Sequence, residues 1–371
     1  MPSPSPVLRA LLCGILLAGG GDTAGQAVEP PKDSAQVEPA PRWKNYFEPM
    51  NHLVALRVAL TDDPEVFDLQ AGDVRYAIDP NIRTALKFSF AYRVVSFSAG
   101  WAPTFLPGNA DNALRGRTRH HRYAFTLMPG HLTQVLAYTR TKGYYLANTS
   151  DFIPGWRKDV DPYIQFPDLV YTSFFGQTGY RTDRRLSFNA LVSQGERQRK
   201  SAGTFMPLLS YHYYELDDRT YLTGTNSSQR SRNIEVVLSA TYVHCFVFLR
   251  NAYVALGGGP GIGYLHTDLL TRLPSGDVDS DQRNILYRAD LSAALGYNGE
   301  RFFGGGQFVG SREQYDQENT VAVVIKDRYY FQVFLGVRFG APRPLRWMVD
   351  RAEEQERRGM ERLKRMFGRK P

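Results

Sequence analysis

The sequence predicts an all-β protein, in which about 12 (12–14) antiparallel strands close into a barrel that crosses a membrane and a short basic helix follows. Four observations support this fold class. Apolar and polar residues alternate with period two through most of the chain. The alternating segments are about ten residues long, the length with which a tilted strand crosses a bilayer. A secretory signal precedes them, and aromatic residues stand at several strand ends.

Residues 1–27 have the organisation of a secretory signal peptide. Arg9 precedes an apolar stretch at 10–19, and small residues end at Ala27. The apolar stretch has about half of the ~20 residues that a membrane-spanning helix needs, so we expect cleavage. Cleavage near Ala27 leaves Cys245 as the only cysteine, and no internal disulfide can then form. Residues 28–42 are polar and rich in proline, and they are expected to form a flexible lead-in.

Residues 43–340 carry the alternation on which the barrel prediction depends. Between Ile82 and Tyr92, apolar side chains share one face, and the other face carries Arg83 and Lys87. A soluble β-sandwich would also alternate, because its strands have one face on the core and one in water. The strand length, the aromatic strand ends and the secretory signal favour a barrel whose apolar face meets lipid and whose polar face lines the lumen.

Thirteen segments have the pattern of strands. They are 52–60, 82–92, 94–102, 122–128, 132–145, 167–178, 185–194, 203–214, 232–244, 250–265, 284–297, 300–311 and 321–340. Single-chain bacterial barrels normally have an even number of strands, so one boundary is wrong, and we place the error at 203–231. Short turns (92–94, 129–130, 298–300) alternate with longer connections (103–121, 146–165, 266–283), which is typical of periplasmic turns and external loops.

The stretch 180–207, YRTDRRLSFNALVSQGERQRKSAGTFMP, contains a recognisable signature. It resembles a Bacteroidota outer-membrane β-barrel family catalogued as domain of unknown function 4421, with its Tyr-Arg-x-Asp-Arg, Ser-Phe-x-Ala and Ser-Gln-x-Glu-x-Gln-x-Lys-Ser-Ala-Gly-Ser-Phe runs. The matching positions are Tyr180, Arg181, Asp183, Arg184, Ser187, Phe188, Ala190, Ser193, Gln194, Glu196, Gln198, Lys200, Ser201, Ala202, Gly203 and Phe205. Thr204 stands where the pattern has Ser. The resemblance covers 43–340 and implies a barrel in the outer membrane of a Gram-negative bacterium, but no activity.

The same stretch has the pattern of a strand, a polar loop and a second strand. We expect Leu186, Phe188, Ala190 and Val192 to form a lipid-facing row. A polar cluster at the barrel mouth is expected to consist of Arg181, Asp183, Arg184, Glu196, Gln198 and Lys200. This cluster could bind an anionic ligand such as a lipopolysaccharide phosphate. The alternative, which we favour, is a loop folded into the barrel mouth by Arg–Glu pairs.

Motifs for cofactors and metals are missing from the sequence, so no cofactor and no metal are expected. The run Asp277-x-Asp279-x-Asp281 begins like a calcium loop, but Gln282 and Arg288 stand where that loop needs Gly and Glu. The seven histidines show no zinc-binding spacing.

One neighbourhood could support lipid chemistry. Ser210 and His212 share a face of the predicted strand 203–214, and Glu215 is close in sequence. The chain has no Gly-x-Ser-x-Gly elbow, and both residues are also explained as ordinary lumen groups. A lipase or lipid A deacylase is therefore kept as the alternative function rather than the preferred one.

The lumen is predicted to be basic. The inward rows would carry the basic residues Arg57, Arg83, Lys87, Arg185, Arg288 and Arg338. Only Glu235 and Asp290 oppose them, which predicts a preference for anions if the barrel conducts. A barrel of this size can instead be filled by side chains.

The tail, residues 341–371, is predicted to be a basic amphipathic periplasmic segment. Its stretch 342–371 has ten basic and five acidic residues and so contributes +5 of the chain's net charge of +8. Such a helix suits an anionic membrane surface or a periplasmic partner, with a partly frayed, solvated helix as the alternative. Because the barrel itself is nearly balanced, nucleic acid is not an expected partner.

The function expected from the sequence is that of an outer-membrane barrel with a structural, binding or narrow-channel role. The expected partners are outer-membrane lipid, lipopolysaccharide and the barrel assembly machinery, which recognises a last strand with an aromatic end such as Phe339.

Overall fold

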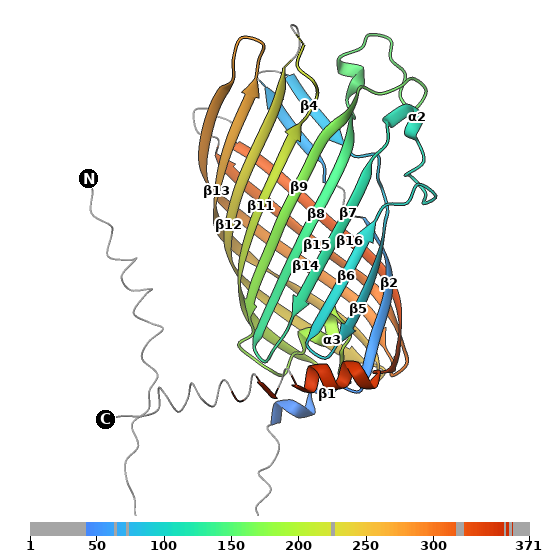
Figure 1. Cartoon of the computed structure of the whole chain (residues 1–371). Helices are drawn as coiled ribbons and strands as arrows, with labels where there is room; N and C mark the ends of the chain where they lie inside the picture. Colours follow the sequence, from blue (N-terminus) through green and yellow to red (C-terminus); the bar gives the residue numbers. More distant parts are fainter. Residues whose placement is uncertain are drawn as a thin grey trace, which may run out of the picture. The chain divides into compact units, whose positions relative to one another are not determined.

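The computed structural model describes residues 42–62, 65–71, 74–223, 227–316 and 323–351, with 354, 355 and 358. In these residues, twelve antiparallel strands close into a barrel (Figure 1). The strands are β2 (Leu53–Asp62), β5 (Ala85–Tyr92), β6 (Val95–Trp101), β7 (Arg119–Leu127), β8 (Leu132–Leu146), β9 (Gln165–Tyr180), β11 (Ala202–Asp218), β12 (Ser228–Phe248), β13 (Ala252–Arg272), β14 (Val278–Asn298), β15 (Phe302–Asp316) and β16 (Val323–Gly340). Pairing of β16 with β2 and of β8 with β9 completes the ring. The predicted all-β antiparallel barrel is confirmed.

Alternation sorts the side chains of each strand between two environments. On β12, Ile234 and Leu238 are 50% and 57% exposed, whereas Glu235 and Ser239, the residues that follow them, are 3% and 2% exposed. Large apolar side chains thus cover the outside and polar ones fill the inside, the arrangement of a barrel that faces lipid. Among the residues that the structure describes, no helix combines the length and the apolar character needed to cross a membrane.

The expected strand at 185–194 is wrong. Residues Phe188–Val192 form the short helix α3, whose N-cap Ser187 accepts a hydrogen bond from the Ala190 amide at 2.9 Å. Leu186 and Ala190, expected to face lipid, are 0% and 1% exposed because this segment lies inside the barrel. Removing this segment turns thirteen strands into twelve. The stretch 203–231, where we placed the error, instead contains most of β11 and the start of β12.

The two ends of the barrel differ as predicted. The connections at 93–94, 128–131, 249–251 and 299–301 are short and lie at one end, hereafter the short-turn end. The other end, the long-loop end, carries the helix α2 (Asn112–Arg115) and the 3₁₀ helix η2 (Thr149–Asp151). The expected connection 266–283 is mostly strand, because β13 and β14 each extend for 21 residues.

Two small elements were not anticipated from the sequence. A hairpin of β3 (Phe67–Ala71) and β4 (Val74–Asp79) pairs with the end of β8 through Ile78↔Leu146 and Asp79↔Tyr145. At the short-turn end, η1 (Arg42–Asn45) leads into β1 (Phe47–Pro49), which pairs with β10 (Glu196–Gln198). Figure 1 shows β1 and α3 at the end opposite β4 and α2.

Both predicted terminal segments extend beyond what the structure describes. The signal peptide and the lead-in lie outside the described residues, apart from Arg42. In the tail, residues 343–351 are helical, in agreement with the prediction, and most of the rest lies outside the described residues.

Candidate functional site

Residues 181–200, between β9 and β11, fold back into the barrel and are called here the plug. Leu186 and Leu191 of the plug pack against wall residues that include Cys245 and Tyr253. Burial of these apolar side chains against the inner wall holds α3 at the short-turn end of the lumen. The same residues would have suited a lipid-facing strand, which explains the wrong prediction.

The barrel wall binds the carbonyl groups at the end of α3. Arg57 Nη1 on β2 donates to the Val192 carbonyl at 2.8 Å, and Gln307 Nε2 on β15 donates to the Leu191 carbonyl at 2.8 Å. Arg338 on β16 donates through Nε and Nη2 to the Gln194 carbonyl at 3.0 and 2.6 Å. Helix C-termini carry unpaired carbonyls and a partial negative charge, which cationic donors satisfy. Arg57 and Arg338 do face inward as predicted, but they bind the plug.

The N-terminal segment covers the plug from the other side. In the β1–β10 ladder, Glu48 forms an ion pair with Arg197, whose Nη2 lies 2.6 Å from Glu48 Oε2. The amide of Arg199 donates to the Tyr46 carbonyl at 2.7 Å. The plug is therefore bound both by the wall and by β1, and the Glu48–Arg197 pair was not anticipated from the sequence.

The predicted polar cluster lies at the short-turn end, where its members hold the plug together. Arg181 Nη1 donates to the Leu186 carbonyl at 2.7 Å, and a second nitrogen donates to the Gly130 carbonyl. Gln198 Nε2 donates to the carbonyls of Arg185 and Lys200 at 2.8 and 2.9 Å. A folded-in loop, the interpretation we favoured, agrees with these contacts.

The remaining members of the cluster bind partners other than those expected. Glu196 accepts a hydrogen bond from Ser187 Oγ at 2.5 Å rather than lying in an Arg–Glu pair. Burial raises the pKa of Glu196, although the Ser187 hydroxyl and the nearby Arg181 oppose this shift. The other contacts of the cluster are Asp183 Oδ2 with Arg185 Nε at 2.7 Å, the Arg184 guanidinium 3.9 Å from the centre of the Trp43 ring, and Lys200 Nζ 5.7 Å from the centre of the Tyr46 ring.

Charges in the middle of the lumen are balanced rather than basic. Arg288 Nε lies 2.8 Å from Asp290 Oδ1, and Arg288 Nη1 lies 3.7 Å from Glu235 Oε1. Arg328 Nη2 lies 3.5 Å from Glu235 and 3.8 Å from Glu313. Glu313 and Arg328 were missed, although their strand period places both inward. The predicted anion-selective path has no support in this network.

Ser210 and His212 face the lumen, as predicted, but Glu215 does not join them. Ser210 Oγ accepts a hydrogen bond from Gln177 Nε2 at 3.2 Å, and His212 Nε2 lies 3.5 Å from the Tyr171 hydroxyl. Glu215 belongs to the opposite row of β11 and binds Arg232 Nε at 2.8 Å. Among the described residues, no three His, Cys, Asp or Glu side chains gather as metal ligands.

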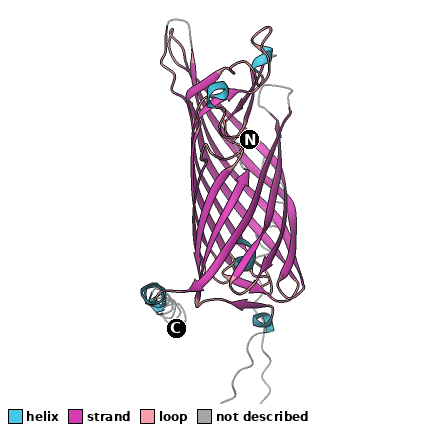
Figure 2. Ribbon diagram, turned by 90° about the vertical axis from the view of Figure 1, so that its right-hand side faces the viewer, coloured by secondary structure: helices cyan, strands magenta, loops and turns pink. Residues whose placement is uncertain are grey.

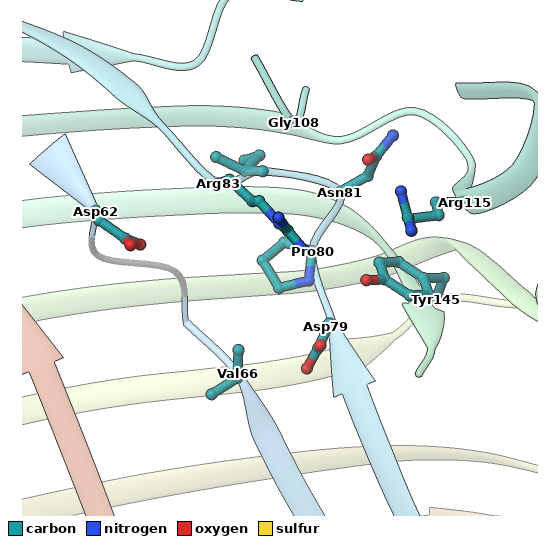
Figure 3. A pocket seen from close by; sticks show the side chains of 10 residues that line it. Asp62, Val66, Asp79, Pro80, Asn81, Arg83, Gly108, Arg115 and Tyr145 are labelled. Carbon is teal, nitrogen blue, oxygen red and sulfur yellow. The ribbon is translucent and has the colours of Figure 1, made fainter. Parts of the chain in front are cut away.

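A pocket of about 390 Å³ opens at the long-loop end, where β2, β4 and the loops meet (Figure 3). It is lined by Asp62, Val66, Asp79, Pro80, Asn81, Ile82, Arg83, Gly108, Arg115 and Tyr145. Arg83, expected in the lumen, lies here. Burial raises the pKa of Asp79.

The Asn81 side chain is fixed at the edge of this pocket. Its Nδ2 donates to the Gly116 carbonyl at 2.8 Å, and its backbone amide donates to Thr118 Oγ1 at 2.8 Å. Within the described part of the chain, the buried Asn81 Oδ1 has no hydrogen-bond partner. A buried acceptor of this kind is a polar group that a ligand can satisfy. Sequence patterning gave no signal for this pocket, because its residues come from separate loops.

The wall and the plug can be compared with known proteins. The model of the family described as "Domain of unknown function (DUF4421)" matches residues 33–339. No curated protein matches the chain.

Among solved structures, the outer membrane protease OmpT from Escherichia coli is 9% identical, with 80% of this chain and 98% of that chain covered and a TM-score of 0.33. OmpT of Vibrio cholerae is also 9% identical, with 77% and 97% covered and a TM-score of 0.30. These likenesses are to outer-membrane proteins and carry no argument about activity. The family match spans most of the chain, and the protein therefore belongs to the DUF4421 family.

Proposed function

We propose that the protein is a barrel of the Gram-negative outer membrane that acts as a structural and ligand-binding module and does not conduct as an open channel. The observation that carries this proposal is the attachment of the plug to three separate strands by Arg57, Gln307 and Arg338. A segment bound at several points of the inner wall blocks the path that a channel needs. The resemblance of the signature 180–207 to Bacteroidota proteins supports a source in that group.

The long-loop end is where we place ligand binding. In outer-membrane barrels the short turns face the periplasm and the longer loops face the outside, so the pocket would open to the cell surface. Its lining combines carboxylates, guanidinium groups and an amide, which suits a small ligand with both donors and acceptors. Sugars, including those of lipopolysaccharide, have this chemistry and surround such a surface. Insertion by the barrel assembly machinery is part of the same proposal.

Planar-bilayer recording of the full-length protein tests the proposal. We expect no stable conductance steps from the wild type, and intermittent steps from the double variant Arg57→Ala/Arg338→Ala, because its plug loses two attachments. Heat-modifiable migration in gels verifies that both proteins are folded barrels. Stable wild-type steps would reject the proposal and restore the narrow-channel alternative.

Glycan binding is tested separately on an array of bacterial glycans. Arg83→Ala removes a lining group of the pocket, and Arg157→Ala removes an arginine that pairs with Asp161 in a neighbouring loop. We expect the wild type to bind a glycan on the array. Arg83→Ala should abolish this binding, and Arg157→Ala should preserve it. Equal binding by both variants would place the ligand elsewhere.

A further inference from the structure

The helix at residues 343–351 packs on the outside of the barrel wall. Its residues Leu345 and Val349 contact the cluster formed by Val54, Tyr92 and Ala341. Val54 and Tyr92 are paired across β2 and β5. Figure 2 shows the helix beside the lower end of the barrel, outside the ring of strands.

Val54 and Tyr92 belong to the rows of the wall that face lipid. In the same rows, Leu56 is 40% exposed and Phe90 is 38% exposed, yet Val54 and Tyr92 are only 1% and 2% exposed. The helix therefore covers the last rung of the lipid-facing surface, at the short-turn end. It does not close the lumen.

Three further contacts hold the helix in this position. The Ala341 amide donates to the His52 carbonyl at 2.9 Å, and Arg346 Nε donates to the Ala341 carbonyl at 2.7 Å. Arg93, in the turn between β5 and β6, places its Nη2 2.5 Å from Asp350 Oδ1. The helix lies crosswise to the barrel axis (Figure 1), and a helix in this orientation on a membrane barrel lies along the bilayer surface.

The face of the helix that the barrel leaves uncovered is apolar and basic. Trp347 and Met348 are 61% and 58% exposed. The exposed Arg351 places its guanidinium 5.2 Å from the centre of the Trp347 ring, and Arg343 is also exposed. Tryptophan beside arginine is typical of the boundary between acyl chains and headgroups. The helix that carries this surface packs on the lipid-facing rows of β2 and β5, and the charge of the surface is opposite to that of anionic headgroups.

We propose that helix 343–351 is an interfacial anchor in the periplasmic leaflet, with Trp347 and Met348 among the lipid chains and Arg343 and Arg351 at anionic phospholipid headgroups. This inference rests on the proposed outer-membrane location and orientation. It selects the membrane surface over a protein partner for this helix, because the helix packs on lipid-facing rows of the wall and leaves Trp347 and Met348 uncovered.

Two full-length single-tryptophan variants test the anchor in vesicles of brominated phosphatidylcholine and phosphatidylglycerol. One variant retains only Trp347, and the other retains only Trp101, which lies in the outward row of β6 and stacks on Phe88. Phenylalanine replaces the other tryptophans, and heat-modifiable migration verifies folding. The anchor predicts bromine quenching of both tryptophans and a blue-shifted emission for Trp347.

The two tryptophans distinguish a failure of the proposed anchor from a failure of the proposed membrane location. If Trp101 is quenched but Trp347 is unquenched and has the emission maximum of a tryptophan in water, the anchor is overturned and the membrane location stands. The exposed surface of the helix would then bind a protein partner. Absence of quenching at Trp101 overturns the membrane location itself, and with it the anchor.

Neutralising two arginines tests whether the helix contacts anionic headgroups. In the Trp347-only background, Arg343→Gln/Arg351→Gln is expected to abolish the increase in quenching that phosphatidylglycerol gives over phosphatidylcholine alone. Arg199→Gln, a basic residue of the plug, is the matched control and should leave that increase unchanged. An unchanged lipid dependence in the double variant contradicts the headgroup contact.

Discussion

Replacement of Arg338 tests how firmly the wall holds the plug. Arg338 is 3% exposed, and its guanidinium donates to the Gln194 carbonyl, the Gly299 carbonyl and Asn298 Oδ1. Arg338→Met keeps most of the apolar stem but removes every donor. The plug then keeps its contacts with Arg57 and Gln307 but loses the hydrogen bonds that Arg338 donates to the Gln194 carbonyl.

The expected cost follows from the acceptors left behind. A buried acceptor that loses its partner costs about 1–3 kcal/mol, and Arg338→Met removes the Arg338 donors from one such acceptor in the plug, the Gln194 carbonyl. Taking about 3 kcal/mol for the plug and a tenfold change for every ~1.4 kcal/mol, opening of the plug should become about 100-fold more frequent.

Hydrogen exchange of the amides at 186–195, measured by mass spectrometry on the folded protein, reports that opening. We expect exchange about 100-fold faster in Arg338→Met and unchanged exchange in the strands far from the plug. Arg185→Met is the matched control, because this half-exposed arginine pairs with Asp183 at the surface and such pairs contribute about 0–1 kcal/mol. Equal exchange rates in the wild type and Arg338→Met would refute the role given to Arg338.

Three further predictions concern other parts of the chain. Gly143→Ala should destabilise the barrel by at least about 2 kcal/mol more than Gly155→Ala, as measured by unfolding in guanidinium. Both glycines have positive φ (+91° and +79°), but only at Gly143 would a Cβ collide with a backbone carbonyl. Because the pKa of Glu196 is raised, the folded protein binds the proton of this carboxyl more tightly than the unfolded chain does. The stability that this proton contributes is therefore lost as pH rises from about 4.5 through the folded pKa, and Glu196→Gln should remove this pH dependence. Ser210→Ala and His212→Ala should leave the lipid A mass spectrum of the host unchanged, and an altered spectrum would revive the lipid-modifying alternative.

The barrel could be predicted from the sequence because each of its strands repeats one simple pattern. On β16, Phe331, Val333 and Leu335 are outward and exposed, while Gln332 and Phe334 between them are buried, as the period of two requires. Lipid imposes this pattern on every strand, so the pattern survives without knowledge of the neighbours. The predicted number of about twelve strands is confirmed, and of the thirteen segments with the pattern of a strand only 185–194 is not one.

The plug could not be predicted because its apolar residues occur at the same alternate positions as those of a strand. Leu186, Phe188, Ala190 and Val192 suit an outer wall, and α3 has only five residues, too few for a helical period to appear. Whether an apolar residue meets lipid or the inside of a plug depends on contacts with distant strands. The same reason hid the role of Arg57, whose inward position was predicted but whose partner is 135 residues away.

The most direct test of the closed lumen uses the chain's own thiol. Cys245 faces the plug and is 0% exposed, in contact with the cluster that includes Leu186 and Leu191. A small water-soluble thiol reagent is added to the folded protein in vesicles, and labelling of Cys245 is followed by mass spectrometry. Glu300→Cys, in an exposed turn at the same end, provides the control for access. We expect rapid labelling at position 300 and none at Cys245 until the protein unfolds. Labelling of Cys245 in the folded wild type at the rate seen at position 300 would contradict a plug that closes the barrel.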